Sequence, residues 1–221
     1  MQLRELDLDW PQAGRTERQT FRRQTRCISS LYERMLGPIS VEAGWKVLVE
    51  CVRDVQRDDI RNLLGVFVVQ MPFDHAAFAA ADVTGRKQRA LDALHRGAVR
   101  VAVGQSWATA PFEGALEQVV RRNYVNEWTW PDPRWSPGGT HKAFLRCLHD
   151  VDRFRAWLVV EDRQGAEVGR ELVLDEEPDE FLFVPKMGAL VWVSEQVVKL
   201  HAKSGDSVGR LVLRVEVPHP G

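Results

Sequence analysis

The sequence predicts an α+β fold, with antiparallel β-sheet built from N-terminal strands and a C-terminal β-meander and packed with two central helices. The main observation is that the hydrophobic period changes from about two residues to about 3.6 and back along the chain. Strands grouped on either side of a helical block favour α+β over alternating α/β. The 221 residues and the 44% hydrophobic content are typical of a globular chain with its own core.

Residues 1–36 have the least clear pattern of apolar residues. Residues 1–20 are polar, so we expect a loosely ordered N-terminal arm. Residues 21–36 fit a helix by the spacing of their apolar side chains, but their central part is equally compatible with a strand. The Gly37-Pro38 break would connect a hairpin well, which favours a strand over 25–34.

The remaining elements follow from clearer periodicity. Apolar stripes predict helices over 86–103 and 110–122, and Pro111 suits the first turn of the second helix. No internal boundary is evident, so we expect one domain over 1–221. Alternating or continuous apolar runs predict strands at 45–52, 63–71, 124–130, 143–149, 154–161, 167–174, 181–184, 190–193, 197–203 and 208–217.

Composition and charge exclude several classes of protein. The net charge of −1 gives no global attraction to nucleic acid or to a membrane surface, so we expect no nucleic-acid partner. The longest uncharged runs have 12 residues, whereas a membrane-spanning helix needs about 20 apolar residues. The N-terminus lacks the apolar stretch of a signal peptide, which favours a cytoplasmic protein.

The three cysteines favour a reduced protein. Cys27, Cys51 and Cys147 are far apart and form no CxxC pair. The simplest interpretation is three buried thiols that pack as small apolar side chains. The histidines are scattered, with no pair three or four residues apart on a predicted helix, so we expect no cofactor and no bound metal.

The densest cluster of catalytic residue types comprises His141, His149, Asp150 and Asp152. Imidazole and carboxylate groups can bind zinc, iron or manganese, or carry out general-base catalysis. Aspartates in a tight turn more commonly bond to their own backbone, and a histidine in a strand can be structural. A metal-dependent or acid/base hydrolase is therefore the alternative function.

Tryptophan is the most unusual feature, with eight in the chain. Trp128, Trp130 and Trp135 are close in sequence and are the predicted binding residues, because aromatic side chains anchor interfaces. The alternative is that two of these indoles lie in the core and one covers it. Pro133 and Pro137 flank Trp135, which makes its burial harder to arrange.

Two further segments could bind charged groups. The backbone amides around Gly138 and Gly139 could bind an anion, although a plain loop is the simpler interpretation. An acidic segment over 175–180 could attract a basic partner or be a solvated loop. Its carboxylates are Asp175, Glu176, Glu177, Asp179 and Glu180.

No catalytic fingerprint stands out. The sequence contains neither a Gly-x-Ser-x-Gly elbow nor a Walker loop. The predicted function is therefore a non-enzymatic cytoplasmic protein-binding domain, and a scaffold subunit is a further possibility. Bacterial immunity proteins, which neutralise toxins, are a suitable reference class by architecture and composition alone. The predicted partner is another protein, with a toxin as the leading example, and the oligomeric state stays open.

Overall fold

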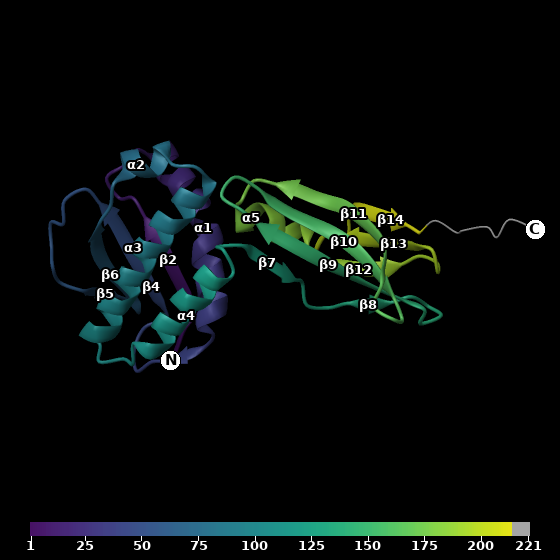
Figure 1. Ribbon diagram of the computed structural model, residues 1–221, viewed down its shortest axis with the longest axis horizontal. Helices are drawn as coiled ribbons and strands as arrows, with labels where there is room; N and C mark the ends of the chain where they lie inside the picture. Colours follow the sequence, from purple (N-terminus) through teal and green to yellow (C-terminus); the bar gives the residue numbers. More distant parts are fainter. Residues whose placement is uncertain (214–221) are drawn as a thin grey trace, which may run out of the picture. The chain divides into compact units, whose positions relative to one another are not determined.

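The computed structural model describes residues 1–213 and shows two compact units (Figure 1). The N-terminal unit comprises residues 1–126 and 150–152, and the C-terminal unit comprises residues 127–149 and those from 153 onward. The fold is mixed α+β with mostly antiparallel sheets, which confirms the predicted class. Where the sequence predicts one domain, two separate hydrophobic cores form, one in each unit.

The N-terminal strands form a sheet of their own. Its core is parallel, with β2 (Glu5–Asp9), β4 (Lys46–Val52) and β6 (Val66–Pro72) side by side. The strand β5 (Arg61–Leu63) adds an antiparallel edge, and the short strands β1 (Gln2–Leu3) and β3 (Ile39–Ser40) pair separately. The predicted antiparallel arrangement is therefore wrong for these strands. Parallel neighbours need a long crossover connection between them.

That crossover is the helix α1 (Arg15–Leu36), so the expected strand over 25–34 is wrong. Phe21, Ile28 and Tyr32 are buried at helical spacing, and this packing decides between the two patterns. Gly37 ends the helix at a φ of 65°, a conformation that favours glycine. Residues 1–20 also form no loose arm, because β2 inserts Leu6 and Leu8 into the core.

The two predicted central helices are confirmed as α3 (Val83–Gly104) and α4 (Ala110–Arg121). A short helix, α2 (His75–Ala80), precedes them. The Asp82 side chain caps α3 by accepting the Gly85 N–H at 2.7 Å. Gly97 brings α3 close to the sheet, since a Cβ there would lie 2.4 Å from Cγ2 of Val49.

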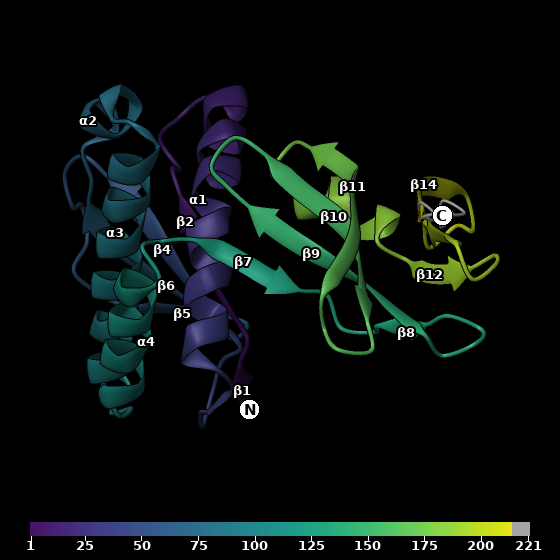
Figure 2. The same cartoon turned by 45° about the vertical axis from the view of Figure 1, so that its right-hand side comes forward.

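The C-terminal unit contains two antiparallel sheets (Figure 2). β10 (Phe154–Asp162) pairs with both β9 (His141–His149) and β11 (Glu167–Glu176). β7 (Asn126–Thr129) and β8 (Arg134–Trp135) also pair with β9. The second sheet contains β12 (Ala189–Trp192), β13 (Val197–His201) and β14 (Ser207–Val212). β11 lies against β14 and β8 against β12, so the two sheets enclose one core.

One predicted strand in this unit is wrong. Residues 181–184 form the helix α5 (Glu180–Phe183) and the start of the 3₁₀ turn η1 (Val184–Lys186). The Asp179 side chain accepts the Phe181 N–H at 3.0 Å and starts the helix. The last strand ends at Val212, and the end of the predicted strand over 208–217 lies outside the described residues. None of the helices in residues 1–213 is long and apolar enough to cross a membrane.

Candidate functional site

The predicted catalytic histidines are far apart. His141 and His149 lie at the two ends of β9, a nine-residue strand, which separates them by roughly 26 Å. His149 is buried in the C-terminal core, where its ring centroid is 5.5 Å from that of Phe183 and 6.1 Å from that of Phe154. The two imidazoles therefore do not share a site.

The predicted catalytic aspartates belong to the N-terminal unit. Asp150 Oδ1 lies 2.8 Å from the ammonium of Lys87, which is buried, and it also accepts the Val151 N–H at 2.8 Å. Asp152 lies 3.9 Å from Arg86. Burial of a lysine is costly unless a carboxylate compensates its charge, so Asp150 has a structural role. Within residues 1–213, His, Cys, Asp and Glu form no group of three or more that could hold a metal ion.

The three predicted binding tryptophans fall into two groups. Trp128 and Trp130 are half-buried against the C-terminal core, and the Trp128 ring lies 6.1 Å from Phe154. Trp135 has 54% of its surface exposed. Trp128 and Trp130 thus fit the alternative that two of the three indoles pack on the core, whereas Trp135 is exposed to solvent.

The backbone around Trp135 is fixed on both sides. Arg134 and Trp135 pair with Ala143 and Lys142 of β9. On the other side, the Trp192 indole donates to the Arg134 carbonyl oxygen at 3.0 Å. The exposed indole therefore projects from a short strand held between β9 and β12, which limits its freedom before any partner binds.

The residues that follow, 136–140, form a compact loop organised by Ser136. Its buried hydroxyl oxygen accepts the N–H groups of Thr140 at 3.2 Å and His141 at 3.3 Å. Its carbonyl oxygen accepts the Gly139 N–H at 2.8 Å. The Arg163 guanidinium donates to the Gly139 carbonyl oxygen at 2.9 Å. We call residues 136–140 the Ser136 loop.

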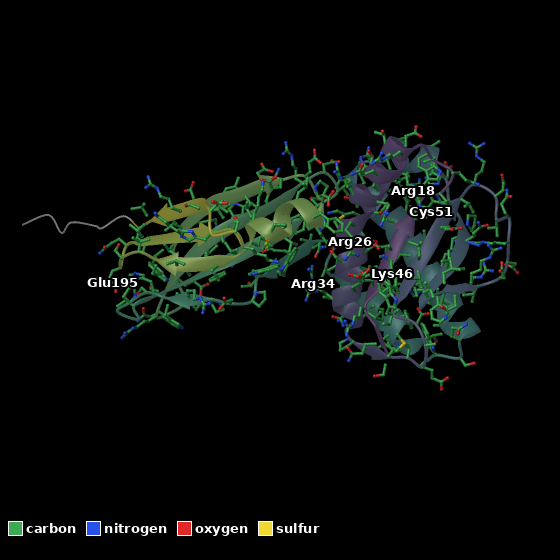
Figure 3. The ribbon with its side chains drawn as sticks, turned by 180° about the vertical axis from the view of Figure 1, so that it is seen from behind. Arg18, Arg26, Arg34, Lys46, Cys51 and Glu195 are labelled. Carbon is green, nitrogen blue, oxygen red and sulfur yellow. The ribbon has the colours of Figure 1, made fainter. Side chains whose placement is uncertain are left out.

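The Ser136 loop holds a carboxylate. Glu195, labelled in Figure 3, accepts the Gly138 N–H through one oxygen and the Thr140 hydroxyl at 3.3 Å through the other. Hydrogen bonds from Ser136, Gly138 and Thr140 hold the pKa of Glu195 below its ordinary value. The anion that the glycines could bind, as the sequence suggests, is therefore a side chain of the same chain.

The acidic segment is also organised within the C-terminal unit. Asp175 lies 3.7 Å from both Arg153 and Arg155, and Glu176 forms an ion pair with Lys186. Asp179 caps α5. Glu177 is exposed and Glu180 is half-buried. Part of this segment therefore serves the fold, which its sequence alone does not reveal.

Two exposed apolar residues beside the acidic segment were not predicted. Phe181 has 90% of its surface exposed and Leu182 has 42%. The continuous apolar run over 181–184 predicts a strand, whereas the short helix α5 forms there and buries Phe183. Large exposed apolar side chains next to each other are typical of contact surfaces.

In the N-terminal unit, charged side chains of α1, β2 and β4 pair with one another (Figure 3). Arg18 binds buried Asp9, with Nε 2.8 Å from Oδ1. Asp7 contacts both Arg26 and Lys46. Burial opposes ionisation of Asp7, but the attraction of Arg26 and the Lys46 hydrogen bond prevail, so its pKa is lowered. Because Arg26 and Lys46 share Asp7, these opposite charges compensate one another in a network.

A second polar network in this unit joins three helices. The Tyr32 hydroxyl of α1 lies 2.9 Å from Nδ1 of His95 in α3 and donates to the Phe112 carbonyl oxygen of α4 at 3.0 Å. His95 Nε2 lies 3.4 Å from a carboxylate oxygen of Glu113. Tyr32 is fully buried, and burial raises its pKa. The network therefore links the helices, and a substrate could not reach the hydroxyl.

An open cavity of about 470 Å³ lies where β6 ends, beside α2 and α3. Phe73, Gln88 and Arg89 line it, together with Asp74 and Asp92. Asp74 already serves as the cap of α2, accepting the Ala77 N–H at 2.9 Å. The lining thus combines helix-capping and surface groups around one aromatic ring.

No protein-family model, curated protein or solved structure matches this chain. Its function has to be inferred from the chemistry of its own residues.

Proposed function

We propose that this chain is a non-enzymatic protein-binding protein that contacts its partner through Trp135. The observation that carries the proposal is that Trp135 is 54% exposed on a strand whose backbone is fixed by pairing with β9. A large aromatic side chain that is already held in place loses little conformational entropy on binding. Residues of this type commonly supply most of the binding energy at an interface.

We propose a second, separate contact at the acidic segment. It lies near the His149 end of β9, because the Phe183 ring is 5.5 Å from His149, whereas Trp135 pairs with Lys142 near the other end of the strand. Phe181 and Leu182 offer apolar area there, and the neighbouring carboxylates favour approach by a basic partner. Charge complementarity of this kind accelerates association more than it tightens the complex. Trp128 and Trp130 are half-buried against the core, so neither proposed contact includes them.

The narrower proposal is that the partner is a protein toxin, which this chain would neutralise by occupying its surface. Binding in the cytoplasm suits the three cysteines, which are all buried and unbridged. The alternative hydrolase gains no comparable support, because His141, His149, Asp150 and Asp152 have separate surroundings.

The test is photo-crosslinking from position 135. A benzophenone amino acid replaces Trp135 in one variant and Gln118 in a matched control, since Gln118 is an exposed polar residue of α4 in the N-terminal unit. The purified product of the neighbouring reading frame is the first partner to try. We expect a covalent adduct from position 135 and none from position 118. Equal labelling from both positions, or labelling from position 118 alone, would contradict the proposal.

A further inference from the structure

We propose that the Ser136 loop is an oxyanion receptor in which Glu195 occupies the place of a carboxylate from the binding partner. The receptor itself is independent of the proposed function, whereas the identity of the incoming group rests on it. The ligand class is an acidic side chain or a chain-terminal carboxylate.

The donors of the Ser136 loop match the two oxygens of one carboxylate. The Gly138 N–H bonds Oε1 of Glu195, and the Thr140 hydroxyl bonds Oε2 at 3.3 Å. Backbone and hydroxyl donors that converge on one small volume are suited to binding an anion.

This receptor does not depend on Glu195 for its shape. Ser136, buried, bonds the backbone of Thr140 and His141, and Arg163 holds the Gly139 carbonyl oxygen from outside. Ser136 also bonds the Glu195 carboxylate, but its bonds to the Thr140 and His141 amides and the Arg163 bond do not include Glu195. The donors therefore stay in position when the carboxylate leaves, which makes the site preformed.

Glu195 can leave without disturbing the strands that carry it. It lies in the turn between β12 and β13, which is closed by the Val193 N–H bond to the Val197 carbonyl oxygen at 2.8 Å. Rotation of its side chain would empty the site and keep this turn closed. Because Glu195 is tethered, it competes at a high effective concentration, and a free carboxylate is excluded unless it makes further contacts.

Trp135 supplies such a contact. It directly precedes Ser136, so the exposed indole and the receptor are adjacent on one short segment. A partner that places an apolar group on Trp135 can present a neighbouring carboxylate to the Ser136 loop. The geometry thus favours an acidic residue next to an apolar one in the partner.

The experiment uses acetate as the probe and backbone amide NMR of the full chain as the readout. Glu195→Ala empties the receptor, and Glu171→Ala, at an exposed position of β11, is the matched control. We expect acetate at constant ionic strength to shift the Gly138 and Thr140 amide signals saturably in Glu195→Ala. The apparent affinity should be at least tenfold weaker in the wild-type protein and in Glu171→Ala. The absence of saturable shifts in Glu195→Ala, or equal shifts in all three proteins, would overturn the proposal.

A second variant fixes the location of the bound acetate. A Cβ on Gly138 would lie 3.0–3.3 Å from the carboxylate atoms of Glu195, so Gly138→Ala combined with Glu195→Ala should abolish acetate binding. Persistent binding in the double variant would contradict the assignment to this loop. Because acetate binding needs no partner, it can succeed where crosslinking from position 135 fails, and the two proposals are tested separately.

Discussion

Two tryptophans beside prolines have opposite environments in the two units. Trp10, which precedes Pro11, stacks on His75 in the N-terminal unit with ring centroids 3.7 Å apart. Phe21, Phe73 and Phe78 complete this aromatic cluster. Trp135 in the C-terminal unit is held by strand pairing with β9, but the residue is 54% exposed.

The difference shows that a proline near a tryptophan does not determine whether the indole is covered or exposed. Trp10 has a role in stability because α1 and α2 supply rings that cover it. Trp135 is held through the pairing of β8 with β9, so the fold fixes its position and leaves apolar area exposed. Variants in the two regions should therefore affect different properties.

The largest expected effect is on stability in the aromatic cluster around Trp10. Phe21 is 3% exposed and contacts Trp10, Phe73, His75 and Phe78. Phe21→Ala should lower the free energy of unfolding by about 3–5 kcal/mol, measured by urea denaturation. Leu64→Ala is the control and should stay within about 0.5 kcal/mol. Similar losses of unfolding free energy for both variants would contradict the stabilising role of this cluster.

A smaller effect concerns the pH dependence of the same cluster. Burial lowers the pKa of His75 below its ordinary 6.5, so the folded state favours the neutral ring. The unfolded chain then binds a proton more readily, and stability falls as the pH drops below about 6.5 until the folded His75 also titrates. The slope from this single group cannot exceed about 1.4 kcal/mol per pH unit.

His75→Phe isolates this contribution because it keeps an aromatic ring against Trp10. Denaturation at pH 7.5 and pH 5 should show a smaller loss of stability on acidification for the variant than for the wild-type protein. An identical loss in both proteins would mean that His75 is not shielded from solvent.

The smallest effect on stability is expected beside Trp135. Trp192→Phe removes the indole N–H that bonds the Arg134 carbonyl oxygen at 3.0 Å. Loss of one partly exposed hydrogen bond should cost about 0.5–1.5 kcal/mol in urea denaturation. The Ser136 amide, which donates to the His141 carbonyl oxygen at 2.9 Å, should also exchange with solvent faster, because β8 is released on one side. Unchanged exchange would show that pairing with β9 alone holds the strand.

The sequence predicts much of the fold where a single period dominates. The central helices and most C-terminal strands have such patterns and are confirmed. The parallel sheet is not predicted, because β2 is only five residues long in a polar segment. Its pairing with β4 depends on α1, whose central residues fit both a helix and a strand.

The candidate site is predicted in part. The prolines beside Trp135 correctly suggest poor burial, and the glycines of the Ser136 loop suggest an anion. The sequence does not show that this anion is the Glu195 carboxylate, because Glu195 is 57 positions from Gly138. The two residues meet because β8 packs against β12. Phe181 was missed because capping by Asp179 turns an apparent strand into a helix.

The central claim is that Trp135 is a binding residue that contributes little to stability. The direct measurement is calorimetric titration of wild-type and Trp135→Ala proteins with the partner identified by crosslinking. Urea denaturation of both proteins is measured alongside. We predict a loss of at least about 2 kcal/mol of binding free energy, roughly 30-fold in Kd, with a smaller loss of stability. Unchanged affinity, or a loss of stability as large as the loss of affinity, would contradict the claim.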